Sequence, residues 1–204
     1  VKLTLQTPAV VDYLLESVRR WAEVFGIDGL RLDVAYMLDR DFMRRLHTFT
    51  RELKPDFVLI GETLHGDYNQ IVNDEMLDSC TNYECYKGLT SALNSDNLFE
   101  IEHSLTRLFG REQWCLYTGK HLFNFADNHD VIRACTAIAD KRKLAALYTI
   151  LYCMPGIPCV YYGSECGAEG DKSDGDYKLR PFIGDIDKNK APELSALIKK
   201  LNGI

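Results

Sequence analysis

The sequence predicts an α/β protein in which helices cover a parallel β-sheet. Short apolar runs alternate with segments of helical periodicity along nearly the whole chain. The predicted strands are apolar on both faces, as is typical of parallel strands buried between two layers. With 204 residues, of which 46% are hydrophobic, the chain has enough apolar material for one sizeable core. We therefore expect a single domain over residues 1–204.

The first predicted element is an amphipathic helix. Apolar residues recur at i, i+3, i+4 and i+7 from Val11 to Phe25, which is the period of one helix face. Thr7 is suited to the N-cap, Pro8 to the first helical position, and Gly26 to the end of the helix. The next segment, GLRLDVA, is short and mostly apolar and predicts a strand.

The remaining elements continue the alternation. A second helix is predicted from about 41 to 53, and the following KPD sequence breaks it before the apolar strand FVLIGET. In chain order the other expected elements are a weaker strand in MLDSCTNY (76–83), helices around 84–95 and 98–109, strands in HLFNFAD (121–127) and GIPCVYYG (156–163), the intervening helix KLAALYTILYCM and a final amphipathic helix PELSALIKKLN. This amounts to about five strands and at least six helices.

Composition argues against several classes of partner. The net charge of -6 disfavours nucleic acid and anionic membrane surfaces, which require clustered Lys and Arg. No apolar run approaches the roughly 20 residues that span a bilayer, and the start VKLTLQTP lacks the features of a secretory signal. The seven cysteines have no metal-binding spacing and favour buried thiols in a reducing compartment such as the cytoplasm.

Three predicted strands end in an acidic residue: Asp33, Glu62 and Asp130. The carboxyl ends of parallel strands converge on one rim, where ligands bind. Arg31 lies two residues before Asp33, so both side chains lie on the same face of the strand. Taken alone, a structural ion pair is the more ordinary explanation of this spacing. Glu62 alone would be a helix N-cap or first-turn acid, and Asp130 could cap the helix that follows.

Two of these acids meet the chemical needs of glycoside cleavage. One carboxylate must stay ionised as a nucleophile, and the other must carry a proton to the leaving oxygen. The positive charge of Arg31 favours the ionised form of Asp33. The apolar run before Glu62 favours the protonated form there. The sequence therefore predicts Asp33 as the nucleophile and Glu62 as the acid.

The segments GLRLDVA, the strand ending IGE, and FADNHD resemble, in this order, three short regions of the α-amylase superfamily of retaining glycoside hydrolases. VKLTLQTP resembles the tail of a further region in its neopullulanase and cyclomaltodextrinase branch. The likeness extends from about residue 2 to 200. It implies a partial (β/α)8 TIM barrel with roughly strands 4 to 8 and their helices, acting on α-1,4-linked maltodextrins or cyclodextrins.

The resemblance also implies residue roles. Asp33 forms the covalent glucosyl intermediate, Glu62 is the general acid and then base, and Asp130 holds sugar hydroxyls in the transition state. His129 donates a hydrogen bond to the sugar and Asn128 supports its turn. The implied substrate-binding set is Arg31, His129, Asn128 and Arg180. The aromatic residues Tyr36, Tyr68, Tyr162 and Trp114 are candidates for stacking on sugars, although packing in the core or at the rim explains each of them as well.

The sequence departs from the family pattern in two ways. Where many α-amylases have Lys-His after the nucleophile, this chain has Tyr36 and Met37, so we expect no cofactor and no metal, and a calcium site of that type is not supported. The regions typical of barrel strands 1 to 3 are also missing. Since five strands cannot close an eight-stranded barrel, we expect a fragment of a longer enzyme or self-association through open strand edges.

Two alternatives to a hydrolase remain open at this point. The first is a transglycosylase of the same superfamily, which the sequence does not distinguish from a hydrolase. The second is a catalytically silent module or an inactive half-barrel fragment. The three acids argue against a degenerate parent enzyme, but they do not establish activity of this chain.

Overall fold

The structure is a computed structural model that describes residues 3–204; Val1 and Lys2 of the VKLTLQTP segment lie outside the described residues. The chain divides into two compact units, residues 1–81 and 82–204, and each is described by itself. The single domain expected over residues 1–204 stays a prediction.

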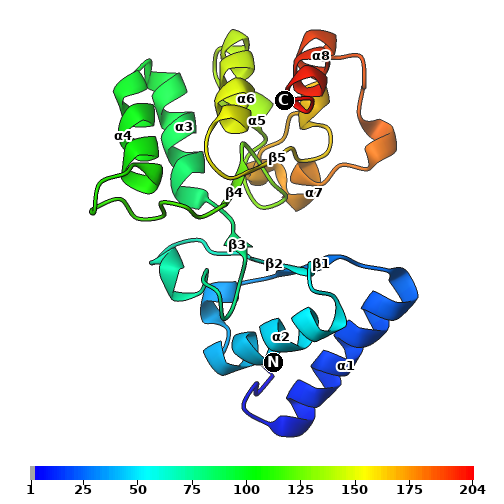
Figure 1. The fold of residues 1–204 in the computed structure, drawn as a ribbon. Coiled ribbons are helices and arrows are strands. Elements are labelled where there is room, and N and C mark those ends of the chain that lie inside the picture. The colour runs from blue at the N-terminus through cyan, green and yellow to red at the C-terminus, as the bar shows by residue number, and fades with distance from the viewer. Residues whose placement is uncertain (1–2) are drawn as a thin grey trace. The chain divides into compact units, whose positions relative to one another are not determined.

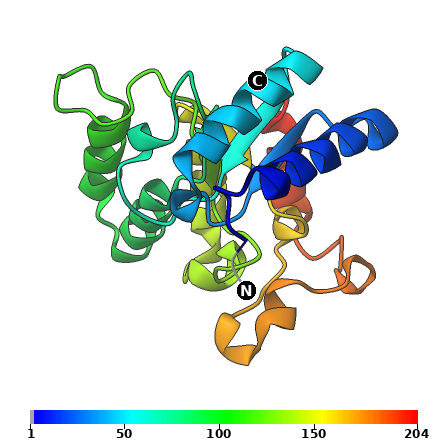
Figure 2. The ribbon, with the colours of Figure 1, turned by 90° about the horizontal axis from the view of Figure 1, so that it is seen from below.

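The first unit contains a parallel three-stranded sheet in the order β1-β2-β3. Arg31 is paired in register with Ile60, and Leu32 with Gly61. Helices α1 and α2 pack against each other and lie on the same side of this sheet (Figure 1; Figure 2 shows them from below). The elements are α1 (Pro8–Phe25), β1 (Gly29–Leu32), α2 (Arg40–Leu53), β2 (Val58–Gly61) and β3 (Ser79–Cys80).

Helix α1 begins and ends where the sequence predicts. Thr7 precedes it in an extended conformation, and Pro8 occupies its first turn. Gly26 ends it in the left-handed region, at φ 64°, and donates its N–H to the carbonyl of Ala22. A glycine adopts this conformation without a steric penalty, which explains the sharp end of the helix.

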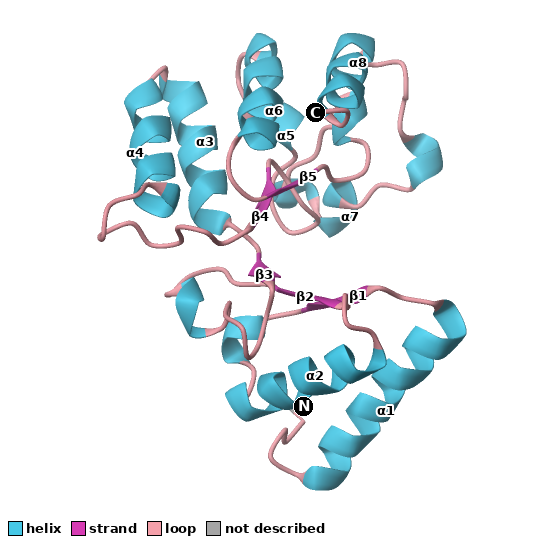
Figure 3. Cartoon of the chain, in the orientation of Figure 1, coloured by secondary structure: helices cyan, strands magenta, loops and turns pink. Residues whose placement is uncertain are grey.

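The second unit contains a parallel pair of strands, β4 and β5. Helices α3 and α4 pack side by side, and α6 packs on α8. Figure 3 shows that the strands are short and that long loops join many of the elements. The elements are α3 (Tyr83–Ser95), α4 (Leu98–Phe109), β4 (Phe123–Phe125), α5 (Ala134–Ala137), α6 (Leu144–Cys153), β5 (Ile157–Cys159), α7 (Asp176–Leu179) and α8 (Pro192–Leu201).

The predicted order of helices and strands is confirmed, with differences in extent. The strand expected in MLDSCTNY is reduced to Ser79–Cys80, and the one-turn helices α5 and α7 were not predicted. Within residues 3–204, no helix combines the length and apolar character needed to cross a membrane. None of the seven cysteines, all of which lie within this range, forms a disulfide.

Candidate active site

In the first unit, Arg31 joins two of the predicted catalytic acids. Its Nη1 lies 2.5 Å from Oδ1 of Asp33, which confirms that the two side chains share a face. Its Nη2 lies 2.9 Å from Oε1 of Glu62. The first contact follows from a spacing of two residues, whereas the second depends on the register between β1 and β2. Sequence reasoning found the first and missed the second.

The pairing of β1 with β2 brings Glu62 to the segment that follows Asp33. The N–H of Glu62 donates to the carbonyl of Leu32 at 2.8 Å, and the N–H of Ala35 donates to the carbonyl of Glu62 at 2.9 Å. Gly61 permits this approach, because a Cβ there would lie 2.8 Å from Cβ of Ala35. The end of β2 and the turn after Asp33 are therefore held together by main-chain contacts.

Val34, the residue after Asp33, has an unusual backbone conformation. Its φ is 47° and its ψ is 41°, in the left-handed region that β-branched residues rarely adopt. In this conformation its N–H donates to Oε2 of Glu62 at 3.0 Å. Strained backbone of this kind persists where the surroundings determine it and is frequent at functional sites.

The contacts of Glu62 bear on the acid role that the sequence predicts for it. The apolar run before it suggested a proton-carrying acid, yet both of its oxygens face donors, Arg31 on one side and the Val34 N–H on the other. The Glu62 side chain is 7% exposed, whereas that of Asp33 is 70% exposed. The more accessible acid is thus the predicted nucleophile.

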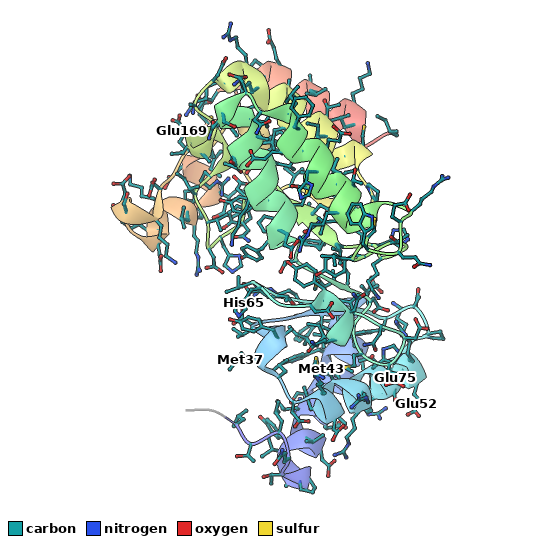
Figure 4. All side chains as sticks on the ribbon, turned by 90° about the vertical axis from the view of Figure 1, so that its left-hand side faces the viewer. Met37, Met43, Glu52, His65, Glu75 and Glu169 are labelled. Atoms are coloured by element: carbon teal, nitrogen blue, oxygen red, sulfur yellow. The ribbon has the colours of Figure 1, made fainter. Side chains whose placement is uncertain are left out.

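Side chains after the strand ends gather at one rim of this unit. Met37 follows β1, His65 follows β2, and both lie on the same side in Figure 4, opposite Glu52 and Glu75. The rings of Tyr36 and His65 are 4.9 Å apart. The segments that follow β1 and β2 therefore lie at one rim of this unit.

Of the aromatic candidates, Tyr68 is fully buried and acts as a core residue. Tyr162 is half-buried and donates its hydroxyl to the carbonyl of Pro181. Trp114 is 56% exposed.

In the second unit, Asn128 supports the turn that carries His129 and Asp130. Its Oδ1 accepts from the N–H of Asp130 at 2.8 Å and from that of Val131 at 3.2 Å. Its Nδ2 donates to the hydroxyl of Tyr83 at 3.0 Å. A side chain that accepts from the backbone two residues later forms an Asx turn. The predicted position of Asn128 in this turn is therefore confirmed.

Asp130 lies between two cationic or hydrogen-bonding side chains. Nε2 of His129 is 3.0 Å from Oδ2, and Nη2 of Arg180 is 2.8 Å from Oδ1. Nε of Arg180 also donates to the carbonyl of His129 at 3.1 Å. The four residues predicted in this unit, including Asn128, therefore form one cluster.

Sequence reasoning missed a buried polar group beneath this cluster. The side chains of Arg133 and Asp127 are 0% and 1% exposed, and Nε of Arg133 lies 3.3 Å from Oδ2 of Asp127. Burial raises the pKa of Asp127, and Arg133, the N–H of Ala134 and the Ser164 hydroxyl oppose this effect. The feature of the sequence that indicates this buried group is an arginine inside the apolar segment VIRACTAIA.

Asp127 also corrects one reading of Asp130. The carboxylate of Asp127 accepts from the N–H of Ala134, the first residue of α5, at 2.8 Å. Asp130 is instead occupied by His129 and Arg180. The carboxylate that accepts from the first turn of the following helix is therefore that of Asp127, while the N-cap position itself is Arg133. Among residues 3–204, no group of three or more His, Cys, Asp or Glu side chains is arranged to hold a metal ion.

Comparison with known proteins identifies the family of this chain. Residues 1–201 match the family described as "Alpha amylase, catalytic domain". The chain is 33% identical over 190 residues to neopullulanase 2 of Thermoactinomyces vulgaris, a match that covers 89% of this chain and 31% of that protein. It is 30% identical over 178 residues to a cyclomaltodextrinase of Geobacillus thermopakistaniensis, covering 83% and 29% respectively.

Solved structures agree with this result. The maltogenic amylase of S. marinus superimposes with a TM-score of 0.78 at 29% identity, over 97% of this chain and 28% of that one. The chain thus spans about a third of the length of the relatives it matches. Its fold is that of α-amylase TIM-barrel enzymes, consistent with a partial barrel. The chain belongs to the α-amylase catalytic-domain family.

Proposed function

We propose that this chain is part of a retaining α-glucan hydrolase that cleaves α-1,4-linked maltodextrins or cyclodextrins. The observation that carries the proposal is the trio of Arg31, Asp33 and Glu62, in which one guanidinium contacts both acids. Family membership and the names of the relatives, cyclomaltodextrinase and neopullulanase, support the substrate class.

In the first step, Asp33 attacks the anomeric carbon and Glu62 gives its proton to the leaving oxygen. The exposure of Asp33 supports its role as nucleophile, because the attacking oxygen must reach the sugar. Oε1 of Glu62 pairs with Arg31, and its Oε2 accepts from the N–H of Val34. Each carboxylate oxygen has two acceptor sites, so the proton that Glu62 delivers has a site beside these contacts.

In the second step, Glu62 removes a proton from water, and the water releases the sugar from Asp33 with overall retention. The ion pair of Glu62 with Arg31 and its hydrogen bond from the Val34 N–H suit this base form. Asp130 is proposed to bind sugar hydroxyls in the transition state, with His129 and Arg180 holding its carboxylate. Arg31 orients Asp33.

The experiment that tests this proposal measures reducing sugar released from maltoheptaose and from β-cyclodextrin. Wild type is compared with Asp33→Ala, and with Asp28→Ala as a matched control. Asp28 is also an exposed aspartate paired with a cation, Lys54. We expect Asp33→Ala to lose activity by at least 10³-fold, as is common for an essential nucleophile, and Asp28→Ala to keep it.

Three outcomes would redirect the proposal. Equal activity of wild type and Asp33→Ala would exclude Asp33 as the nucleophile. Longer oligosaccharides as the main products would indicate a transglycosylase. A folded chain that binds maltoheptaose without turnover would indicate a catalytically silent module. The cytoplasmic location and self-association of the chain stay predictions.

A further inference from the structure

We propose that Arg133 is a positioning residue that fixes His129, Asp130 and Arg180 from beneath. Its side chain is fully buried, whereas those of His129, Asp130 and Arg180 are one-third to one-half exposed. The inference rests on the proposed function, because it assumes that this cluster serves the substrate.

Arg133 holds the main chain on one side of Arg180. Its Nη1 donates to the carbonyl of Leu179 at 3.2 Å. On the other side, Tyr162 donates its hydroxyl to the carbonyl of Pro181 at 2.7 Å, and Nη2 of Arg133 donates to the carbonyl of Tyr162 at 2.6 Å. The backbone on both sides of Arg180 is therefore linked to one buried guanidinium.

Arg133 also reaches the turn that carries His129. Its guanidinium lies over the ring of Tyr161, 4.4 Å from the centroid, and the rings of Tyr161 and His129 are 6.4 Å apart. Its main-chain N–H donates to the carbonyl of Gly170 at 3.0 Å. One residue thus contacts three separate chain segments around the cluster.

Asp127 and Ser164 lock Arg133 in this orientation. The Ser164 hydroxyl lies 2.7 Å from Oδ1 and 2.8 Å from Oδ2 of Asp127, and Nη2 of Arg133 donates to the same hydroxyl at 3.2 Å. A buried charge is tolerated when it is paired and hydrogen-bonded. Gly163 leaves room, since a Cβ there would lie 3.3 Å from Nη2 of Arg133.

A planar guanidinium with several fixed donors suits this task better than a lysine ammonium. The test therefore compares Arg133→Lys, which keeps the charge, with Ser164→Ala, which removes only the bridging hydroxyl. Asn124→Ala is the matched control, because Asn124 is buried in the same unit and bonds to Asn82 and to the carbonyl of Pro155.

The first readout is NMR of the isotope-labelled 204-residue chain. The Nε–H of Arg180, which donates to the carbonyl of His129, and the backbone amides of residues 128–130 are followed. We expect Arg133→Lys and Ser164→Ala to shift these signals or to accelerate their exchange with solvent. Asn124→Ala should leave them in place at a similar loss of thermal stability.

The second readout is turnover of maltoheptaose. Small displacements of positioning groups cost up to about 100-fold in rate, so Ser164→Ala is expected to lower kcat/KM by roughly 10-fold or more, with most of the loss in kcat. Asn124→Ala should keep both constants. An inactive wild type would count against the proposed function and leave the NMR comparison to decide the role of Arg133.

The inference would be overturned if the Arg180 Nε–H and the amides of residues 128–130 responded to Ser164→Ala no more than to Asn124→Ala. If Arg133→Lys fails to fold, Ser164→Ala carries the test, because it removes a single hydroxyl and leaves the buried charge in place. Unchanged signals in a folded Arg133→Lys protein would also contradict the proposal.

Discussion

The two units hold their acids by opposite means. In the first unit, Arg31 is 37% exposed and contacts two carboxylates directly at the strand ends. In the second, the arginine beneath the cluster is fully buried and contacts carbonyls, a hydroxyl and a different carboxylate. In the first unit the arginine acts on the charge of the acids themselves. In the second unit it fixes the conformation of the chain around them.

The largest effect that this comparison predicts is the loss of stability caused by Arg133→Met. This change leaves Asp127 buried without its cation and should lower the free energy of unfolding by about 3–5 kcal/mol. Lys190→Met is the control, because Lys190 pairs with Glu169 at 2.6 Å while both are about half exposed. That change should cost less than about 1 kcal/mol. Urea unfolding measures both, and equal losses would contradict the difference in burial.

A smaller loss is expected for Arg31→Met. It removes one charged contact from the buried Glu62, and hydrogen bonds to charged groups contribute about 1.5–3 kcal/mol. Unfolding by urea again gives the value. Arg44→Met is the control, since Arg44 is exposed and pairs with Asp41 and Glu75, and it should cost less than Arg31→Met. A loss for Arg31→Met that matched Arg133→Met would remove the contrast between the units.

The third prediction concerns the strained backbone at Val34. Left-handed conformations of such residues cost about 1–3 kcal/mol, and glycine has no such strain but loses more entropy on folding. Val34→Gly should therefore stabilise the chain by about 1 kcal/mol or less. Asp96, at φ 58°, is the matched site, and Asp96→Gly should gain less because aspartate tolerates this region. Thermal unfolding measures the stability of both variants. A clear loss of stability for Val34→Gly would show that the backbone at this site is unstrained.

The smallest effect is on thiol reactivity in the second unit. Burial raises the pKa of Cys85 to about 12, so this thiol stays protonated and protected at pH 8, whereas Cys153 is exposed. Iodoacetamide labelling followed by peptide mass spectrometry should modify Cys153 first. Arg133→Met should accelerate labelling of Cys85 by opening the unit. Equal rates for the two thiols in the native protein would contradict the compact interior.

Local patterns predicted much of the fold. The helix from Pro8 to Phe25, its proline start and its glycine end followed from periodicity and capping alone. The strand in MLDSCTNY was overestimated because its pairing with β2 is limited to two residues in register. Such pairing depends on a neighbouring strand, which no local pattern contains.

The candidate site was predicted in part for the same reason. Asp33, Glu62 and Asp130 were found because each follows a strand. The contact of Arg31 with Glu62 depends on strand register, and the contacts of Arg133 join residues more than 25 positions apart. Long-range contacts of this kind determine the chemistry of a site. No regular spacing in the sequence predicts them.

The shared position of Arg31 has a consequence for the proposed reaction cycle. In the free chain one positive charge is divided between Asp33 and Glu62. Once Asp33 carries a glucosyl group as an ester, it no longer bears a negative charge, and the whole field of Arg31 acts on Glu62. Glu62, after giving its proton to the leaving oxygen, would thus gain a counter-ion for its carboxylate at the stage at which it must be ionised to activate water. The same guanidinium would then favour the ionised form of Glu62 when the role of this residue changes from acid to base.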